Sequence, residues 1–218
     1  FPGGFSYGDY VRAGAIWGKE LIAKLGQDLE KFVEEGKPVL GICNGFQVLV
    51  EGGLLPGFEG ISEYPTAALA PNTSMKYECR WTYLKHESSG NCVFTKNIPE
   101  GERIFMPVAH AEGRFTFPRE KEGDYLKKLY EGDQLVFRYC DERGYYAEGR
   151  YPTNPNGTLH DIAGICNPEG NVFGLMPHPE RAYYGWQLPN WTHKSRMRKH
   201  GDGNPIFESM IQYLLKEL

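Results

Sequence analysis

The pattern of hydrophobic and polar positions near the start of the chain predicts a helix followed by a short strand. Between residues 19 and 35 the apolar side chains recur at helical spacing, at Leu21, Ile22, Leu25, Leu29, Phe32 and Val33. The pattern stops at Gly36, and Pro38 precedes a short apolar run at 39–42 that has the length of a buried strand. A second helical stretch, 45–51, follows at once. An alternation of helix, strand and helix is typical of a layered α/β sheet.

The central part of the chain, from residue 61 to about 150, changes to short β-like pieces separated by Gly, Pro and Asn turns. The clearest of these pieces are 80–84, 104–108 and 134–139. Two further apolar runs, 161–166 and 171–176, lie on either side of Pro168-Glu169-Gly170, and we expect them to form a hairpin.

The end of the chain predicts an amphipathic helix. Asn204 is a suitable N-cap residue, and Pro205 suits the first helical position. The apolar residues that follow share one face: Ile206, Phe207, Met210, Ile211, Leu214, Leu215 and Leu218. Taken together, the elements predict an α/β fold with a layered sheet flanked by helices.

Composition and charge narrow the class of protein. A chain of 24.7 kDa with 40% hydrophobic residues can bury a core, and we expect residues 1–218 to form a single domain. We find no apolar run of about 18 residues and no charged-then-apolar leader in these residues, so we expect no membrane span, while a leader ahead of residue 1 stays open. A net charge of −4 and a pI near 5.9 argue against nucleic acid as a main ligand.

The cysteines favour a reducing compartment. They are odd in number and form no Cys-x-x-Cys pair, which argues against a disulfide framework and against a zinc site. The five are Cys43, Cys79, Cys92, Cys140 and Cys166. We therefore expect free thiols, no metal, and a cytoplasmic protein.

The most distinctive local feature is Cys43, which lies between Gly41 and Gly45 where the predicted strand meets the predicted helix. A thiol on such a sharp turn stands clear of the backbone, and the helix N-terminus favours the thiolate. The two glycines let the flanking backbone approach the turn closely. The pattern indicates a nucleophile elbow. The alternative is an inert cysteine, since free cysteine is among the most buried residue types.

Two His-x-Glu pairs offer a general base with an acidic partner. In an extended segment, His178 and Glu180 lie on the same side of the backbone, and the prolines at 177 and 179 restrict the chain around them. A histidine can accept the thiol proton and return it to a leaving amine, while a carboxylate holds the imidazole in the right tautomer. His110 and Glu112 have the same spacing, so spacing alone does not say which histidine partners the cysteine.

The glycine-rich start of the chain offers a site for a developing oxyanion. Acyl transfer needs backbone N–H groups aimed at that charge. The turn Pro2-Gly3-Gly4 can supply one from Gly4, and the amide of Asn44, directly after the cysteine, can supply the other. An ordinary glycine-rich loop is the alternative.

Three strings of the sequence, taken in order, resemble the class I, triad-type, glutamine amidotransferases. They are Pro2-Gly3-Gly4-Phe5, Gly41-Ile42-Cys43-Asn44-Gly45-Phe46-Gln47 and Pro177-His178-Pro179-Glu180-Arg181. Within that family, longer strings are similar to the glutaminase subunits of phosphoribosylformylglycinamidine synthases, enzymes of purine biosynthesis. These are residues 2–14, 54–57, 109–113, 154–157 and 176–181.

The resemblance implies a flavodoxin-like fold, with an open and mostly parallel sheet flanked by helices, and a division of roles. It assigns the catalytic triad to Cys43, His178 and Glu180 and the oxyanion hole to Gly4 and Asn44. It also implies that Gln47, one helical turn after the cysteine, helps to hold the substrate glutamine; a solvated helix position is the alternative.

The second His-x-Glu pair then needs another role. His110 and Glu112 would shape the glutamine pocket or a partner-facing surface, or they are merely structural. The resemblance does not decide among these.

The resemblance also implies partners. Glutamine is the substrate, and ammonia passes to a separate synthetase subunit that uses ATP and Mg, with a small third subunit bridging the two. This chain has no Gly-x-x-x-x-Gly-Lys-[Ser/Thr] string, so we expect no cofactor in this subunit. Two rival functions stay open: an amidotransferase subunit that serves another acceptor, and a catalytically silent regulatory or binding subunit.

Two segments bear on this interpretation. Members of the family carry further chain, including the first strands of the sheet, before the Pro-Gly-Gly turn. Since this sequence opens on that turn without a methionine, we interpret it as an N-terminally truncated fragment whose independent folding is an open question. Residues 181–204, rich in aromatic and basic side chains, pack against the synthetase partner or form a solvated loop.

Overall fold

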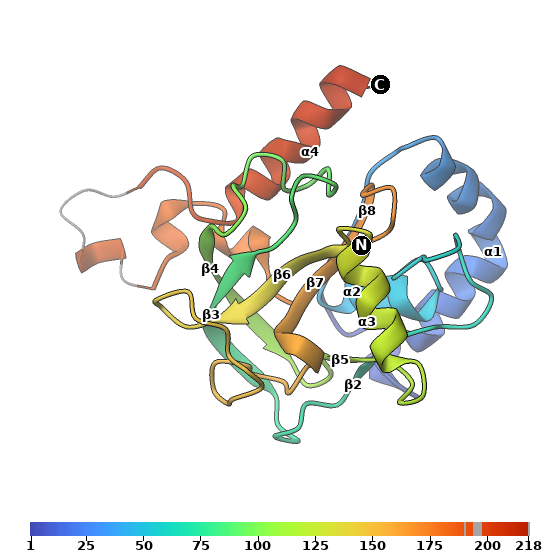
Figure 1. The fold of residues 1–218 in the computed structure, drawn as a ribbon, viewed down its shortest axis with the longest axis horizontal. Coiled ribbons are helices and arrows are strands. Elements are labelled where there is room, and N and C mark those ends of the chain that lie inside the picture. The colour runs from blue at the N-terminus through green and yellow to red at the C-terminus, as the bar shows by residue number, and fades with distance from the viewer. Residues whose placement is uncertain (190, 194–197, 218) are drawn as a thin grey trace.

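Six strands form the main sheet, in the order β1-β8-β7-β6-β3-β4 (Figure 1). The structure is a computed structural model that describes residues 1–189, 191–193 and 198–217. The strands are β1 (Val39–Ile42), β3 (Glu78–His86), β4 (Arg103–His110), β6 (Leu135–Cys140), β7 (Ile162–Cys166) and β8 (Val172–Leu175). A smaller antiparallel sheet joins β2 (Ala68–Ala70) to β5 (Arg114–Thr116).

The α/β class predicted from the sequence, with helices flanking an open sheet, is confirmed, but the pairing of the strands is mixed. Only β1 and β8 run parallel among the described strands, and the other four pairings of the main sheet are antiparallel. A parallel pair needs a long crossover connection, usually a helix. β7 and β8 instead form the predicted hairpin, and the β-rich stretch between residues 78 and 140 adds three more strands in antiparallel arrangement. The prediction of a mostly parallel sheet is therefore wrong for the described residues.

Two helices at the start of the chain agree with the hydrophobic pattern. α1 spans Ala15–Glu34 and α2 spans Asn44–Glu51. Every residue of α2 is buried, because this short helix packs on β1, β8 and α1 at once. A Cβ at Gly41 would lie 2.8 Å from the Gly45 carbonyl carbon, so the two glycines allow the strand and the helix to approach closely, as expected.

One helix was not predicted. α3 (Glu122–Glu131) lies within the stretch expected to be β-like. Its residues Tyr125, Leu126 and Leu129 share a face, and Leu129 is fully buried. This spacing is helical and was present in the sequence, but the Gly- and Pro-rich surroundings concealed it.

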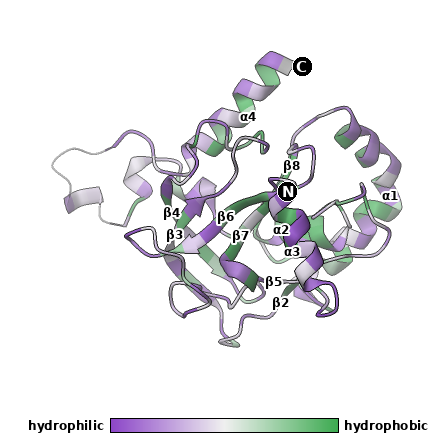
Figure 2. Cartoon of the chain, viewed as in Figure 1, coloured by the Kyte–Doolittle hydropathy of each residue, from purple (hydrophilic) through white to green (hydrophobic). Residues whose placement is uncertain are grey.

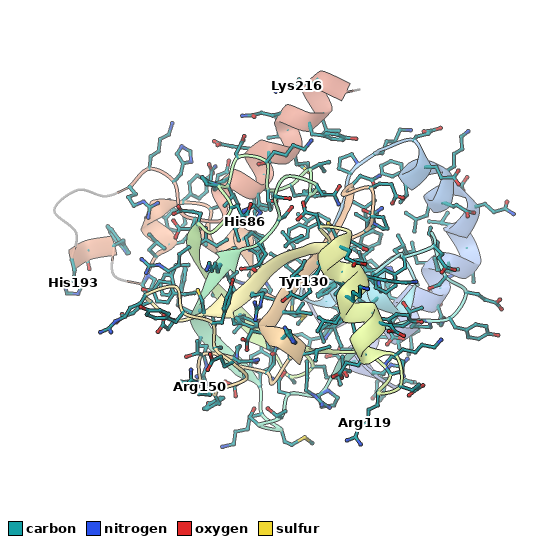
Figure 3. All side chains as sticks on the ribbon, in the orientation of Figure 1. His86, Arg119, Tyr130, Arg150, His193 and Lys216 are labelled. Carbon is teal, nitrogen blue, oxygen red and sulfur yellow. The ribbon has the colours of Figure 1, made fainter. Side chains whose placement is uncertain are left out.

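The core lies between the main sheet and the helices. Figure 2 shows hydrophobic residues concentrated along β6, β7 and α2, whereas the other helices change colour along their length, as helices with one buried face do. The large fully buried aromatic side chains are Phe46, Phe94, Phe115, Phe137, Tyr139 and Phe173. The labelled side chains of Arg119, Arg150, His193 and Lys216 point outward from the edges of the molecule (Figure 3).

The chain closes with α4 (Asn204–Glu217), which confirms the predicted helix; Leu218, expected on its apolar face, lies outside the described residues. Short 3₁₀ helices occupy several loops: Ser6–Asp9, Leu159–Asp161, Pro179–Ala182, Gly185–Gln187 and Trp191–His193. Over the described ranges, no helix is both long and apolar enough to cross a membrane.

Candidate active site

Cys43 occupies the sharp turn between β1 and α2. Its φ of 51° and ψ of −105° are rare for a residue with a side chain. The surrounding structure holds this strained conformation, because the Cys43 N–H donates to the Leu175 carbonyl at 2.8 Å and its carbonyl accepts the Gln47 N–H at 3.1 Å. The thiol is 5% exposed and donates to the Ala109 carbonyl at 3.5 Å. The elbow geometry inferred from the glycines is thus present.

His178 and Glu180 meet near the end of β8. His178 Nδ1 lies 2.6 Å from Glu180 Oε1, and the His178 N–H donates to the Pro107 carbonyl of β4 at 2.8 Å. The segment is not extended as expected: His178 caps a 3₁₀ helix, Pro179–Ala182, that nevertheless brings the two side chains together. In the neutral imidazole, this contact places the proton on Nδ1, because a carboxylate oxygen accepts, and leaves the lone pair on Nε2. Nε2 is buried and has no hydrogen-bond partner within the described part of the chain.

The parallel pairing of β1 with β8 brings the thiol and the imidazole to one edge of the sheet. Ile42, directly before the cysteine, pairs with Leu175, three residues before the histidine. Both side chains flank Gly3: a Cβ there would lie 2.8 Å from His178 Cε1 and 3.5 Å from Cys43 Cβ. Gly3, Cys43 and His178 line a pocket of about 330 Å³. Its lining residues are Pro2, Gly3, Gly4, Phe5, Ile42, Cys43, Tyr77, Ala109, His178, Glu180, Arg181 and Phe207.

The contact at Gly3 predicts the effect of a small substitution. In Gly3→Ala, the added methyl group would push the His178 ring away from its place beside the thiol. A displacement of this kind is expected to lower kcat for glutamine hydrolysis by about 10- to 100-fold. Gly123→Ala, at a position where a Cβ meets nothing within 4 Å, is the matched control and should keep full activity. Equal activity of the two variants in a glutamate-release assay would contradict this geometry.

The protonation of Cys43 differs from the sequence prediction. Burial raises the pKa of the thiol to about 12, and the neighbouring Asn44 N–H opposes that rise by a smaller amount. The helix N-terminus therefore acts in the predicted direction, but desolvation outweighs it. In the free pocket the sulfur is a neutral thiol, so its reaction as a nucleophile needs a base.

The two expected oxyanion donors lie on the wall of the pocket or beside it. Gly4 lines the pocket with a φ of 151°, a value that L side chains rarely adopt. Asn44 is the first residue of α2, so its N–H has no carbonyl within the helix and faces the sulfur instead. Its side chain ties the start of the chain to the helix, since Asn44 Oδ1 accepts the Ser6 N–H at 3.2 Å. Their role as an oxyanion hole stays a prediction.

The side chain of Gln47 bonds to protein groups through both of its polar atoms. Its amide nitrogen donates to the Glu112 carbonyl at 2.5 Å, and its oxygen accepts from the Asn44 amide at 2.9 Å. The Glu112 carboxylate in turn accepts the Ala13 N–H at 3.0 Å. Neither Gln47 nor Glu112 is among the residues that line the 330 Å³ pocket. Their contribution to substrate binding stays a prediction, and their contacts connect α2 with the loop after β4 and with the loop before α1.

His110 lies behind the pocket, at the end of β4. Its Nδ1 lies 3.2 Å from Asn72 Oδ1, and its ring packs against Gly113. Burial, and secondly the charge of His178, lower the pKa of His110 to about 3. A histidine that is neutral throughout the physiological range, with Asn72 as its partner, is suited to a structural role. The structure does not bring His110 and Glu112 into a pair resembling that of His178 and Glu180.

The depressed pKa of His110 predicts how stability depends on pH. Between the unfolded pKa, about 6.5, and the folded value, the unfolded chain binds a proton that the folded chain does not, so acidification favours unfolding. Protonation of His110 in the unfolded chain should lower the free energy of unfolding by about 2 kcal/mol when the pH falls from 7.5 to 5. Urea unfolding at the two pH values should show that loss in the wild type and a smaller one in His110→Gln. Identical losses in the two proteins would contradict the prediction.

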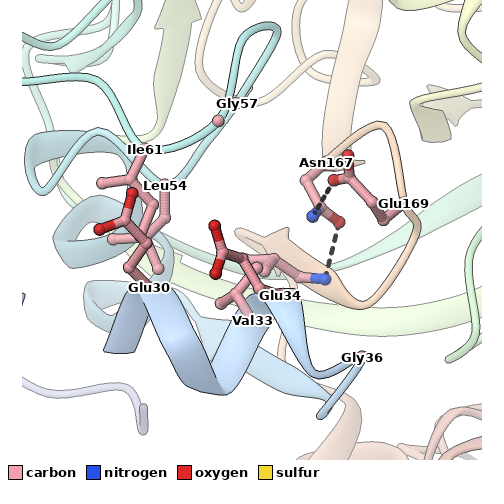
Figure 4. A pocket seen from close by; sticks show the side chains of 11 residues that line it. Glu30, Val33, Glu34, Gly36, Leu54, Gly57, Ile61, Asn167 and Glu169 are labelled. Atoms are coloured by element: carbon pink, nitrogen blue, oxygen red, sulfur yellow. Dashed lines mark hydrogen bonds between the residues drawn. The ribbon is translucent and has the colours of Figure 1, made fainter. Parts of the chain in front are cut away.

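A second pocket, of about 370 Å³, lies near the residues at which β1 and β8 begin, away from Cys43. Figure 4 shows it from close by. The carboxylates of Glu30, Glu34 and Glu169 surround it. The Asn167 amide donates to Glu169 at 2.7 Å, and its oxygen accepts the Val172 N–H at 2.8 Å, so its polar groups are satisfied. No thiol or imidazole is among its lining residues, all of which the structure describes. It offers no nucleophile and is not the candidate site.

Comparison with known proteins gives the family. A model of the CobB/CobQ-like glutamine amidotransferase domain matches residues 1–214. The chain is also 53% identical to the phosphoribosylformylglycinamidine synthase subunit PurQ of Archaeoglobus fulgidus, across 99% of this chain and 77% of that protein. This chain belongs to the PurQ family of glutamine amidotransferase domains.

Further PurQ proteins and a solved structure agree. The PurQ subunit of Methanothrix thermoacetophila is 43% identical, with 98% of this chain and 80% of that protein covered. The structure of PurLQS from Thermotoga maritima matches with a TM-score of 0.70 and 36% identity, over 98% of this chain and 77% of that chain. The PurQ family resemblance inferred from the sequence strings is therefore confirmed.

Two ionisable residues of the pocket were given no role from the sequence. Tyr77 comes from the loop before β3, and Arg181 follows Glu180 directly. Arg181 had been counted in the aromatic and basic segment 181–204, without a role in the pocket. Residues 190 and 194–197 of that segment lie outside the described residues. In the described part, Tyr184 and Trp186 stack with ring centroids 5.5 Å apart and are about half exposed.

Proposed function

We propose that this chain is the glutaminase subunit of a phosphoribosylformylglycinamidine synthase and that Cys43, His178 and Glu180 are its catalytic triad. The observation that carries the triad is the pocket shared by the strained Cys43 and by His178, whose Nδ1 is held by Glu180 while Nε2 has no partner in the described chain. The PurQ relatives carry the assignment to this synthase.

In this proposal His178 Nε2 accepts the thiol proton as the sulfur attacks the side-chain carboxamide carbon of glutamine. A base is needed because the buried thiol is neutral. Glu180 stabilises the imidazolium that forms, and His178 then passes the proton to the leaving nitrogen, which departs as ammonia. Water attacks the γ-glutamyl thioester with His178 as base again, which releases glutamate and restores the thiol.

The charge on the substrate oxygen needs donors during both attacks. The N–H groups of Gly4 and Asn44 are proposed for this role. The Asn44 N–H already points at the sulfur, beside which the oxyanion develops. The positive φ of Gly4 explains why a glycine is needed on the other wall.

The released ammonia is proposed to pass to a synthetase subunit. The solved relative is a complex, PurLQS, which supports an assembly of the same kind here. In it the synthetase partner would use ATP and Mg to convert formylglycinamide ribonucleotide to the amidine, and a small third subunit would bridge the two. The described part of residues 181–204 is proposed to contact the synthetase. We propose that the complex works in the cytoplasm.

The assignment to this synthase is tested by measuring glutamate release from glutamine. The protein is measured alone and then together with the synthetase partner, ATP and formylglycinamide ribonucleotide. We expect release that depends on Cys43 and rises when that acceptor is present. Release that is indifferent to the acceptor would keep the glutaminase and contradict the purine assignment. The absence of release under every condition would favour a silent subunit.

A further inference from the structure

Five ionisable side chains line the active-site pocket, and three of them belong to the proposed triad. Cys43 is neutral, and His178 and Glu180 are engaged with each other at 2.6 Å. The remaining ionisable residues of the lining are Tyr77 and Arg181. Arg181 is therefore the cationic side chain of this lining that is not already committed to the triad.

The guanidinium of Arg181 is available to a ligand. Its Nε lies 3.6 Å from Glu180 Oε1, an oxygen already bonded to His178. An ion pair at this distance and with the arginine side chain 53% exposed holds the guanidinium only weakly. Within the described residues, the guanidinium of Arg181 donates no hydrogen bond to a protein acceptor; only its backbone N–H does, to the His178 carbonyl at 3.2 Å. Five N–H groups in a planar fork at a pocket wall are suited to a carboxylate.

The proposed substrate carries a carboxylate at a suitable distance from its reacting carbon. In glutamine, four C–C bonds of about 1.5 Å separate the carboxamide carbon from the α-carboxylate, so the two groups lie roughly 5 Å apart when extended. A pocket of about 330 Å³ has room for the whole molecule. A ligand with its carboxamide at Cys43 thus has its α-carboxylate on another part of the wall of the same pocket.

We propose that Arg181 binds the α-carboxylate of the substrate glutamine and thereby selects α-amino acid amides over simple primary amides. This inference rests on the proposed glutaminase function. Arg181 follows Glu180 on the same 3₁₀ helix, so the residue that orients the base and the residue that anchors the substrate move as one unit. Burial raises the pKa of both Cys43 and Tyr77, and the positive charge of Arg181 opposes that rise by a smaller amount, which agrees with a guanidinium close to both side chains.

The proposal is tested by removing the carboxylate from the substrate and the guanidinium from the protein separately. 4-Aminobutanamide keeps the carboxamide and the ammonium group of glutamine but lacks the α-carboxylate. kcat/KM is measured for both amides with the complex that contains wild-type, Arg181→Met or Arg181→Lys protein. Arg143→Met, an exposed arginine outside the pocket, is the matched control. A binding measurement makes the same comparison of the two amides without turnover. It uses the Cys43→Ser protein, with and without the additional Arg181→Met substitution.

We expect Arg181→Met to lower kcat/KM for glutamine by about 10- to 100-fold, mostly through KM, and to change the value for 4-aminobutanamide by less than about twofold. Arg181→Lys should recover part of the loss, and Arg143→Met should resemble the wild type. The affinities should follow the same pattern.

Equal losses for the two amides would overturn this inference alone, because Arg181 would then act through Glu180 and not on the carboxylate. A wild-type protein that does not prefer glutamine to 4-aminobutanamide would overturn it as well. A wild-type complex without Cys43-dependent turnover of either amide would instead overturn the proposed function, and this inference with it.

Discussion

Cys43→Ala is expected to lower glutamate release from glutamine by about 10⁴-fold or more, because without the thiol no thioester forms and only direct attack by water remains. The loss should appear in kcat, since the pocket around the small side chain is unchanged. The variant should fold normally, because Cys43 contributes a small side chain at the edge of the core and its backbone bonds to Leu175 and Gln47 remain.

The matched control is Cys79→Ala, which removes an exposed thiol on β3 outside the pocket. It should keep the activity of the wild type in the complex. An active Cys43→Ala protein would show that the reaction does not pass through this sulfur. An inactive Cys79→Ala protein would show that loss of any thiol impairs the assay.

His178→Ala is expected to lower kcat by about 10³-fold or more, since the neutral thiol then has no base and the leaving nitrogen has no acid. His110→Ala removes a buried imidazole of similar size that is neutral and bonded to Asn72. It should lower the free energy of unfolding but leave kcat within about tenfold of the wild type.

The comparison of the two histidine variants decides between the two His-x-Glu pairs of the sequence. Both are measured for kcat and, by urea unfolding, for stability. If His110→Ala abolished thioester formation while His178→Ala did not, the triad assignment would be contradicted. The structure favours His178, because its Nδ1 contacts a carboxylate whereas that of His110 contacts an amide.

Most helices and strands were predicted correctly because their hydrophobic periods are strong. α1, β1, α2, the β7–β8 hairpin and α4 all follow from spacing and from glycine or proline at their ends. Strand direction was not predictable in the same way, because periodicity does not say which strands pair. α3 was missed because its four apolar positions lie between polar residues in a stretch rich in turn residues.

The candidate site was only partly readable from the sequence. Cys43, His178 and Glu180 are marked by glycine and proline neighbours with backbone roles, and the structure brings the three into one pocket. The pKa of the thiol could not be anticipated, since it depends on burial by β4 and β8 and not on the helix alone. Tyr77 belongs to no local motif, and Arg181 ends the Pro-His-Pro-Glu-Arg string without an assigned role, so their position in the pocket emerged only from the fold.

The most direct test of covalent catalysis by Cys43 is mass spectrometry of the protein after acid quenching during turnover of glutamine. If the sulfur attacks the carboxamide, one γ-glutamyl group should be found on the peptide that contains Cys43, and it should be absent from His178→Ala. An adduct on another cysteine, or active turnover with no adduct on Cys43, would contradict the proposed mechanism.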